Sequence, residues 1–225
     1  MLPGQRRIEA SAARALAGLT AMEGRFDEAL GLLERDREIL EDLGLRVAAA
    51  SAAEIAGSVQ LLRGDPVAAE RELRRGYEAF EKMGELANLS TLAAMLAQAL
   101  YAQGRDEEAL RLTETSEASA AAEDLHTQVQ WRAARAKVLA RAGQTEEAVA
   151  LAREAVELGG RTDFLVMRGN AALDLAEVLL LAGRADESVA AARDALALYE
   201  RKGASAAVAA ARRMLPPRGR RASRV

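Results

Sequence analysis

The chain has 225 residues, half of them hydrophobic and 29% charged, with a formal net charge of −3 at pH 7. This length and balance indicate a globular protein that can bury a sizeable core. Aromatic residues make up only 3%, which argues against a β-sandwich or barrel and favours closely packed helices. The absence of cysteine excludes a disulfide framework and a thiolate metal site.

The first residues, MLPGQRRIEA, lack the apolar run of a signal peptide. No later stretch approaches the roughly 18 apolar residues that span a bilayer. We therefore expect a cytoplasmic protein with no membrane partner.

One seven-residue phrase returns along the chain. GRFDEAL is followed by GDPVAAE, GRDEEAL, GQTEEAV and GRADESV, at intervals of 40, 40, 39 and 40 residues. The leading glycines, which suit the positive φ of a helix end, are Gly24, Gly64, Gly104, Gly143 and Gly183. Acidic residues follow each turn except at Asp65-Pro66, where a capping residue precedes a proline. These carboxylates recur in all four of the remaining copies, whereas an active site normally occurs once. Helix capping therefore explains them better than acid–base catalysis does.

Apolar residues at three- and four-residue steps predict a helix on each side of every turn. The expected helices cover about 5–23, 26–43, 46–63, 66–83, 86–103, 106–121, 125–142, 145–158, 164–182, 185–201 and 204–215. A single helical hairpin cannot bury its apolar face, but five stacked hairpins share one core. We expect one domain over 1–215, with repeats at about 5–43, 45–83, 85–122, 124–159 and 163–202 and a capping helix at 204–215.

The repeat resembles the tetratricopeptide repeat (TPR). The resemblance rests on an alanine five residues after the turn glycine, at Ala29, Ala69, Ala109 and Ala148, with Ser188 as a departure. A small residue also lies seven positions before each glycine, at Ala17, Gly57, Ala97, Ala136 and Ala176. The resemblance implies an all-α, right-handed superhelical solenoid. The period of about 40 residues exceeds the family's 34, and we expect the extra residues to lengthen the helices.

Three longer stretches are similar to the C-terminal repeat region of bacterial multidomain adenylate/guanylate cyclases that also carry an ATPase domain. They begin at YAQGRDEEAL, QVQWRAARAK and ALDLAEVLLL. The similarity implies a regulatory repeat region of a signalling protein. It reaches none of the catalytic modules, so it carries over no catalytic residue.

The sequence offers no chemistry of its own. There is no phosphate-binding G-x-x-x-x-G-K-[ST] loop, and the pair Gly159-Gly160 is interpreted as a helix stop. The single histidine, His126, has no partner motif for a metal site and is expected to be an exposed or capping side chain. Trp131 is expected in the core. We therefore predict a protein that is not an enzyme and has no cofactor or metal.

In tetratricopeptide arrays the first helix of each repeat lines the concave surface. Counting back from each turn glycine predicts a partner-binding groove that contains Gln98, Tyr101, Gln130, Lys137, Arg141, Asn170 and Glu177. Amide and charged side chains of this kind, with one aromatic ring, suit an extended or helical peptide.

The leading functional prediction is a protein-binding or scaffold module within a cyclase-like signalling protein. Two alternatives stay open: a peptide- or ligand-sensing module of a transcriptional regulator, and a structural array that associates with itself. Residues 216–225, PPRGRRASRV, are expected to form a basic, disordered tail. Because the sequence pI is about 5.5, nucleic-acid binding by the body of the protein is not expected.

Overall fold

The computed structural model describes residues 3–216, and these residues form eleven helices and no strand. The helices are α1 (Pro3–Met22), α2 (Phe26–Asp42), α3 (Arg46–Arg63), α4 (Pro66–Met83), α5 (Leu86–Ala102), α6 (Asp106–Ser119), α7 (Leu125–Arg141), α8 (Thr145–Gly160), α9 (Leu165–Leu181), α10 (Ala185–Lys202) and α11 (Ser205–Arg213). Every predicted helix is confirmed, with ends within about two residues of the predicted ones. The predicted tail lies outside the described residues except for Pro216.

The turn glycines adopt the predicted left-handed conformation. All five have positive φ, from 75° at Gly183 to 88° at Gly64. The sequence analysis missed that three turns between repeats use the same device, at Gly44, Gly84 and Gly203. The third and fourth repeats differ: α6 ends at Ala120 in an extended conformation, and α8 runs through Gly160 and ends at Arg161, both without a left-handed residue.

The acidic residues after the turns do lie in the first helical turn, but few of them cap it. Among the caps of α2 to α11, only Asp65 and Asp124 have side chains that accept a backbone N–H of the helix that follows. Others reach the neighbouring repeat. Asp27 at the start of α2 pairs with Arg63 at the end of α3, at 2.6 Å. These carboxylates therefore join repeats as well as complementing the helix dipole.

Small residues mark the crossing of the two helices in each hairpin. Ala29, Ala69, Ala109 and Ala148 are fully buried. Ser188 replaces alanine in the fifth repeat without leaving a polar atom unpaired, since its hydroxyl donates to the Ala176 carbonyl at 2.7 Å. Trp131 is 3% exposed, as expected of a core residue.

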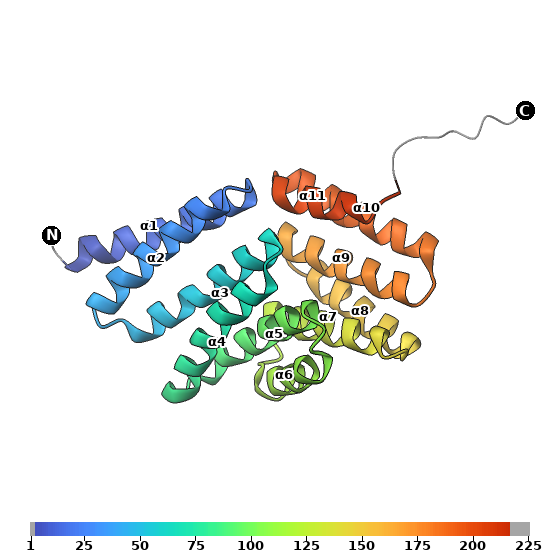
Figure 1. The fold of residues 1–225 in the computed structure, drawn as a ribbon, viewed down its shortest axis with the longest axis horizontal. Coiled ribbons are helices and arrows are strands. Elements are labelled where there is room, and N and C mark those ends of the chain that lie inside the picture. The colour runs from blue at the N-terminus through green and yellow to red at the C-terminus, as the bar shows by residue number, and fades with distance from the viewer. Residues whose placement is uncertain (1–2, 217–225) are drawn as a thin grey trace, which may run out of the picture.

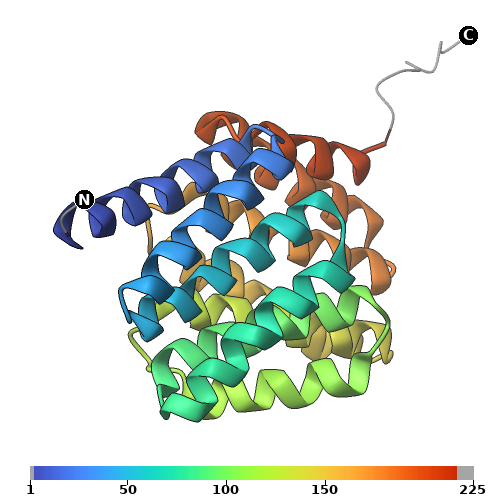
Figure 2. The ribbon, with the colours of Figure 1, turned by 60° about the vertical axis from the view of Figure 1, so that its left-hand side comes forward.

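The hairpins stack into a tightly curved solenoid. The first helices of successive repeats, α1, α3, α5, α7 and α9, contact one another and form the inner layer. Figures 1 and 2 show that the stack turns back on itself until α1 and α2 (blue) lie next to α11 (red). Helix α11 contacts both α1 and α3, where Met22 and Leu62 join an apolar cluster that includes Leu173 and Val208. The C-terminal capping helix thus contacts the first two repeats.

Candidate functional site

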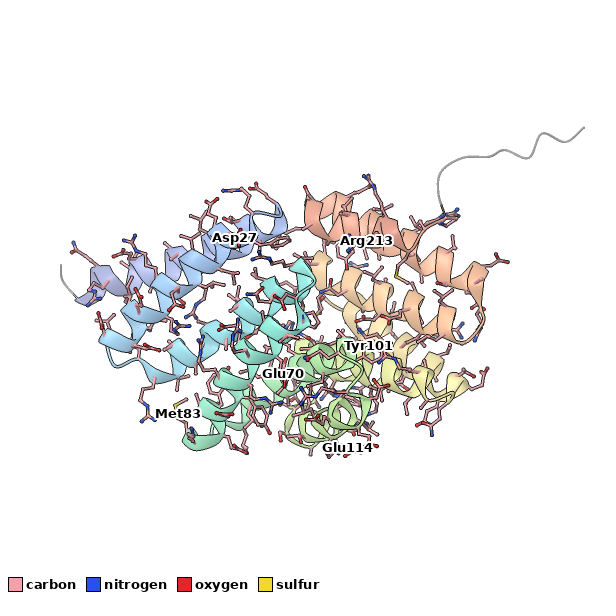
Figure 3. All side chains as sticks on the ribbon, viewed as in Figure 1. Asp27, Glu70, Met83, Tyr101, Glu114 and Arg213 are labelled. Carbon is pink, nitrogen blue, oxygen red and sulfur yellow. The ribbon has the colours of Figure 1, made fainter. Side chains whose placement is uncertain are left out.

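The inner surface gathers polar side chains from three consecutive first helices. Each helix contributes two side chains three or four residues apart, a spacing that places both on one helix face. We call this group the inner polar cluster: Gln98 and Tyr101 from α5, Lys137 and Arg141 from α7, and Asp174 and Glu177 from α9. Figure 3 shows Tyr101 near the middle of the molecule, between the two halves of the solenoid.

A buried ion pair lies at the base of the cluster. Lys137 Nζ is 2.7 Å from Asp174 Oδ1 and 3.9 Å from Glu177 Oε2. The Lys137 side chain is only 9% exposed. Burial raises the pKa of Asp174, although the ammonium group of Lys137 opposes this. The pair is therefore held in a partly dehydrated setting, where losing one partner leaves the other uncompensated.

Tyr101 joins α5 to α9 across the intervening α7. Its hydroxyl donates to Glu177 Oε1 at 2.7 Å. Gln98 makes a longer contact of the same kind, from Nε2 to Asp174 Oδ2 at 3.4 Å. Burial, followed by the hydrogen bond to Glu177, raises the pKa of Tyr101. The phenol therefore stays protonated at neutral pH and acts as a hydrogen-bond donor.

Arg141 stacks on the Tyr101 ring. Its guanidinium carbon lies 3.6 Å from the ring centroid, in a cation–π arrangement. Its Nη1 donates to the Tyr101 carbonyl at 3.0 Å and pairs with Asp106 Oδ1 at 2.6 Å. With 36% of its side chain exposed, Arg141 carries the positive charge of the cluster toward solvent.

A second bridge joins α3 to α7. His126 Nε2 lies 3.6 Å from Glu54 Oε1 and 2.8 Å from Gln130 Nε2. The nearby Glu54 carboxylate raises the pKa of His126. His126 is exposed, as one of the two expectations had it, but it does not cap α7, because Asp124 holds that position.

The structure thus brings five of the seven predicted groove residues into one cluster. Gln130 belongs to the neighbouring His126 bridge, and Asn170 accepts a hydrogen bond from the Tyr199 hydroxyl at 2.7 Å, within the fifth hairpin. The sequence analysis missed Asp174, Glu54 as the partner of His126, and Asp106 as the partner of Arg141. Glu54 was visible as an inner position, ten residues before Gly64.

Among residues 3–216 there is no group of three or more His, Cys, Asp or Glu side chains that could hold a metal ion. Across the same described residues, no helix is long and apolar enough to cross a membrane.

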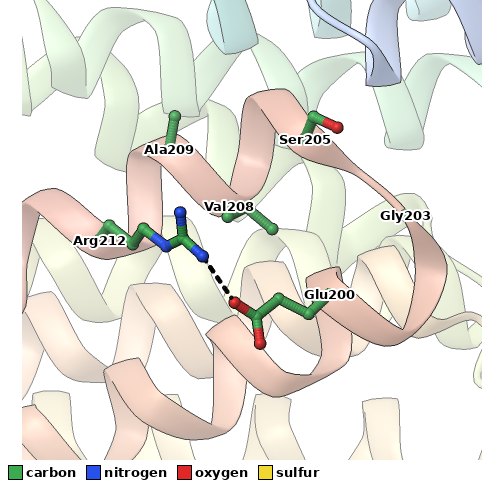
Figure 4. Close-up of a pocket in the computed structure, with 6 residues that line it drawn as sticks. All are labelled: Glu200, Gly203, Ser205, Val208, Ala209 and Arg212. Atoms are coloured by element: carbon green, nitrogen blue, oxygen red, sulfur yellow. Dashed lines mark hydrogen bonds and ion pairs between the residues drawn. The ribbon is translucent and has the colours of Figure 1, made fainter.

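A hollow of about 350 Å³ lies outside the inner surface, between α10 and α11 (Figure 4). Its charged lining consists of Glu200 and Arg212, which pair at 2.9 Å. Their side chains are 50% and 62% exposed. The two charges pair with each other in solvent, so neither is left unpaired for a ligand.

Comparison with known proteins identifies the fold. No family model and no curated protein matches the chain. Solved structures do match. The nearly identical TPR-like repeats assigned to a kinesin light chain of Podosopora anserina share 19% identity, with a TM-score of 0.55 over 89% of this chain and 98% of that one. The chain has the fold of a tetratricopeptide-repeat solenoid.

Two further structures share this architecture. A thermophilic TPR protein of Thermus thermophilus is 22% identical, with a TM-score of 0.54 over 88% of this chain and 98% of that one. BtubC from P. vanneervenii is 18% identical, with a TM-score of 0.54 over 92% of this chain and 98% of that one. The solenoid therefore keeps its TPR architecture even though its helices are longer than a 34-residue repeat requires.

Proposed function

We propose that the chain is a non-catalytic protein-interaction module that recognises a peptide or a segment of a protein with its inner surface. The observation that carries this proposal is the convergence of charged and amide side chains from α3, α5, α7 and α9 on that surface. Recognition by several repeats at once is how a solenoid obtains an extended binding surface.

The buried members of the inner polar cluster hold the exposed ones in place. Tyr101 and Lys137 are both buried, and each contacts Glu177. Arg141 rests on the Tyr101 ring. A partner therefore meets side chains that are already ordered, which lowers the entropic cost of binding.

The exposed groups define the chemistry of the partner. Arg141 offers a cation, while Glu54 and Glu177 offer carboxylates that are 39% and 37% exposed. A segment that carries both an acidic and a basic side chain complements this surface, and the amide of Gln130 adds a hydrogen-bonding group beside them.

The experiment compares two arginines that are each held in an ion pair between repeats. A displayed peptide library is selected on the purified chain, and Kd is measured by calorimetry for wild type, Arg141→Ala and Arg153→Ala. Arg153 pairs with Glu187 at 2.9 Å on the second helices. We expect about tenfold weaker binding for Arg141→Ala and unchanged binding for Arg153→Ala. Equal Kd values for the two variants would contradict the proposal that the inner surface binds the peptide.

We further propose that the module regulates a cyclase-like signalling protein in a bacterial cytoplasm. The support is the sequence similarity of three stretches to the repeat region of such proteins. Mixing the purified chain with a bacterial class III cyclase catalytic module should change its rate of cyclic-nucleotide formation. An unchanged rate, together with no detectable binding, would restrict the proposal to the interaction module alone.

A further inference from the structure

A small cavity opens between the first two repeats, on the side of α3 away from the inner surface. It has a volume of about 120 Å³ and lies between α2 and α4, with α3 as its floor (Figure 1). Its apolar walls are Leu30 and Leu33 of α2 and Ala52 and Ala56 of α3. The two alanines lie two residues before and after Glu54, which places them on the opposite face of α3 from that inner residue. We call this space the outer cavity.

The outer cavity exists because its floor lacks three leucines. The floor residues Ala52, Ala56 and Gln60 stand where α5, 40 residues later, has Leu92, Leu96 and Leu100. Those leucines are at most 1% exposed and pack in one core cluster with residues of α4 and α6. The alanines between α2 and α4 are too short to fill the equivalent space.

The floor of the outer cavity holds an unpaired hydrogen-bond acceptor. Gln60 is 8% exposed, and its Oε1 is buried and accepts no hydrogen bond from the residues that the structure describes. Leaving a buried amide oxygen without a donor is costly. The later first helices avoid this cost with Leu100, Leu139 and Leu179 at the same register position. Gln60 therefore suits a ligand that brings a donor into the cavity.

The charged residues that line the outer cavity are paired with each other. Arg37 pairs with Glu34, and Arg75 pairs with Glu72 at 2.6 Å, each within one helix. The lining thus has no excess charge, and the ligand that suits it is neutral. The side chains of Glu34 and Arg75 are 52% and 45% exposed, so they mark the mouth. Arginine at the mouth packs favourably on the face of an aromatic ring.

Size and polarity together select a phenol. A cavity of about 150 Å³ accepts benzene, so 120 Å³ with an open mouth suits a single aromatic ring. The hydroxyl of a phenol supplies the donor that Gln60 lacks. The chain already contains such a contact, since the Tyr199 hydroxyl donates to the amide oxygen of Asn170 at 2.7 Å while the ring lies against Gly169.

We propose that the outer cavity binds the tyrosine side chain of a partner segment that lies between α2 and α4. The ring enters between the alanines and leucines, and the hydroxyl donates to Gln60 Oε1. The peptide bonds on either side of the tyrosine then meet Glu34 and Arg75, which can accept and donate hydrogen bonds. This inference does not depend on the function proposed for the inner surface.

An NMR titration of the full chain tests the proposal with p-cresol, which is the side chain of tyrosine, and toluene, which lacks only the hydroxyl. We expect p-cresol to shift the side-chain amide signal of Gln60 with a Kd of about 1 mM, and toluene to bind about fivefold more weakly. The amide signal of Gln98 on the inner surface should not move. Equal binding of the two compounds, or binding that leaves Gln60 unshifted, would overturn the proposal.

Two variants that copy the third repeat locate the binding. Gln60→Leu should remove the preference for p-cresol over toluene, and Ala56→Leu fills the cavity and should raise both Kd values at least about tenfold. Ala190→Leu, at an exposed site on α10, is the matched control and should change neither value. Thermal unfolding verifies that each variant folds. A folded Ala56→Leu protein that binds p-cresol as wild type does would contradict the site.

A last comparison separates a tyrosine in a partner chain from a free phenol. N-acetyl-tyrosine amide should bind at least as tightly as p-cresol, and N-acetyl-phenylalanine amide more weakly. A chain that binds p-cresol but not N-acetyl-tyrosine amide would overturn the partner segment, because its cavity would then admit only a free ring.

Discussion

Lys137 and Asp174, one repeat apart on α7 and α9, form an ion pair of 2.7 Å on the inner side of the solenoid. The pair is enclosed by Tyr101 and Glu177, whose hydrogen bond joins α5 to α9. Side chains two repeats apart therefore touch. The third repeat is therefore joined directly to the fifth as well as to the fourth.

Removing one partner of this pair should destabilise the protein. Lys137→Ala leaves the Asp174 carboxylate largely dehydrated, and we expect a loss of about 1–3 kcal/mol in the free energy of unfolding. The apolar double variant Lys137→Met with Asp174→Leu should recover most of that loss, since it removes both charges. Urea denaturation of the three proteins measures this. If Lys137→Ala unfolds at the wild-type midpoint, the pair makes no contribution.

The stability of the second and third repeats should depend on acid pH through Glu70. Burial alone would raise the pKa of this carboxyl, but hydrogen bonds from Arg74, Gln103 and Arg105 outweigh it and lower the pKa to about 2. Because the folded-state pKa is lower than the unfolded one, Glu70 stabilises the fold above pH 4.5 and loses that contribution as the pH falls toward 2.

We expect Glu70→Gln to cost about 2 kcal/mol at pH 7 and much less at pH 3. Glu154→Gln, at a carboxyl that is 59% exposed and pairs with Arg132, is the control and should cost little at either pH. Denaturation curves at the two pH values give both differences. A Glu70→Gln cost that does not change with pH would contradict the assignment.

The bridge between α3 and α7 should be visible in a single titration. His126 is the one histidine of the chain, so its imidazole signal in an NMR spectrum needs no assignment. The Glu54 carboxylate beside it raises its pKa, so Glu54→Gln should move the midpoint down toward the ordinary value of 6.5. The bridge stabilises the fold below that value and its contribution is lost as the pH rises through the folded-state pKa. The same midpoint in both proteins would show that Glu54 and His126 do not meet.

Two glycines should respond to alanine in opposite directions. A Cβ on Gly76 would lie 2.5 Å from the Ala53 Cβ and 3.1 Å from the Ala50 carbonyl, so α4 would have to move away from α3. We expect Gly76→Ala to destabilise by about 1–3 kcal/mol. A Cβ on Gly31 meets nothing within 4 Å, so Gly31→Ala should stabilise α2 by up to about 1 kcal/mol. Thermal unfolding of both variants measures the contrast, and a Gly76→Ala protein as stable as Gly31→Ala would contradict this close packing.

The helices could be predicted from sequence because their signals are local. Each first helix ends at a glycine or close to one, and apolar residues at helical steps define its buried face. The same register located Gln98, Tyr101, Lys137, Arg141 and Glu177 on the inner face. Their convergence follows from the geometry of the stack, in which equivalent positions of neighbouring repeats lie side by side.

Asp174 escaped prediction because its register position is apolar elsewhere. The equivalent residues in the earlier repeats are Ala15, Ile55, Met95 and Ala134. When four of five equivalent positions are apolar, the pattern predicts a core position, and a single aspartate there gives no sign of a binding role. Its role becomes clear only with the Lys137 ammonium group beside it.

The closure of the solenoid could not be predicted from the sequence. Contact between α11 and both α1 and α3 depends on small rotations that accumulate over five repeats. No local pattern around Met22 or Leu62 indicates that these side chains meet the last helix. The same accumulated curvature produces the bridges that skip one repeat, from Glu54 to His126 and from Tyr101 to Glu177.

The most direct test of the inner surface as a recognition site is an NMR titration with a peptide selected on the wild-type chain. Binding should shift the imidazole signal of His126 and the guanidinium signal of Arg141, while the guanidinium signal of Arg153 on α8 stays in place. A peptide that shifts Arg153 and leaves His126 and Arg141 unchanged would contradict the account.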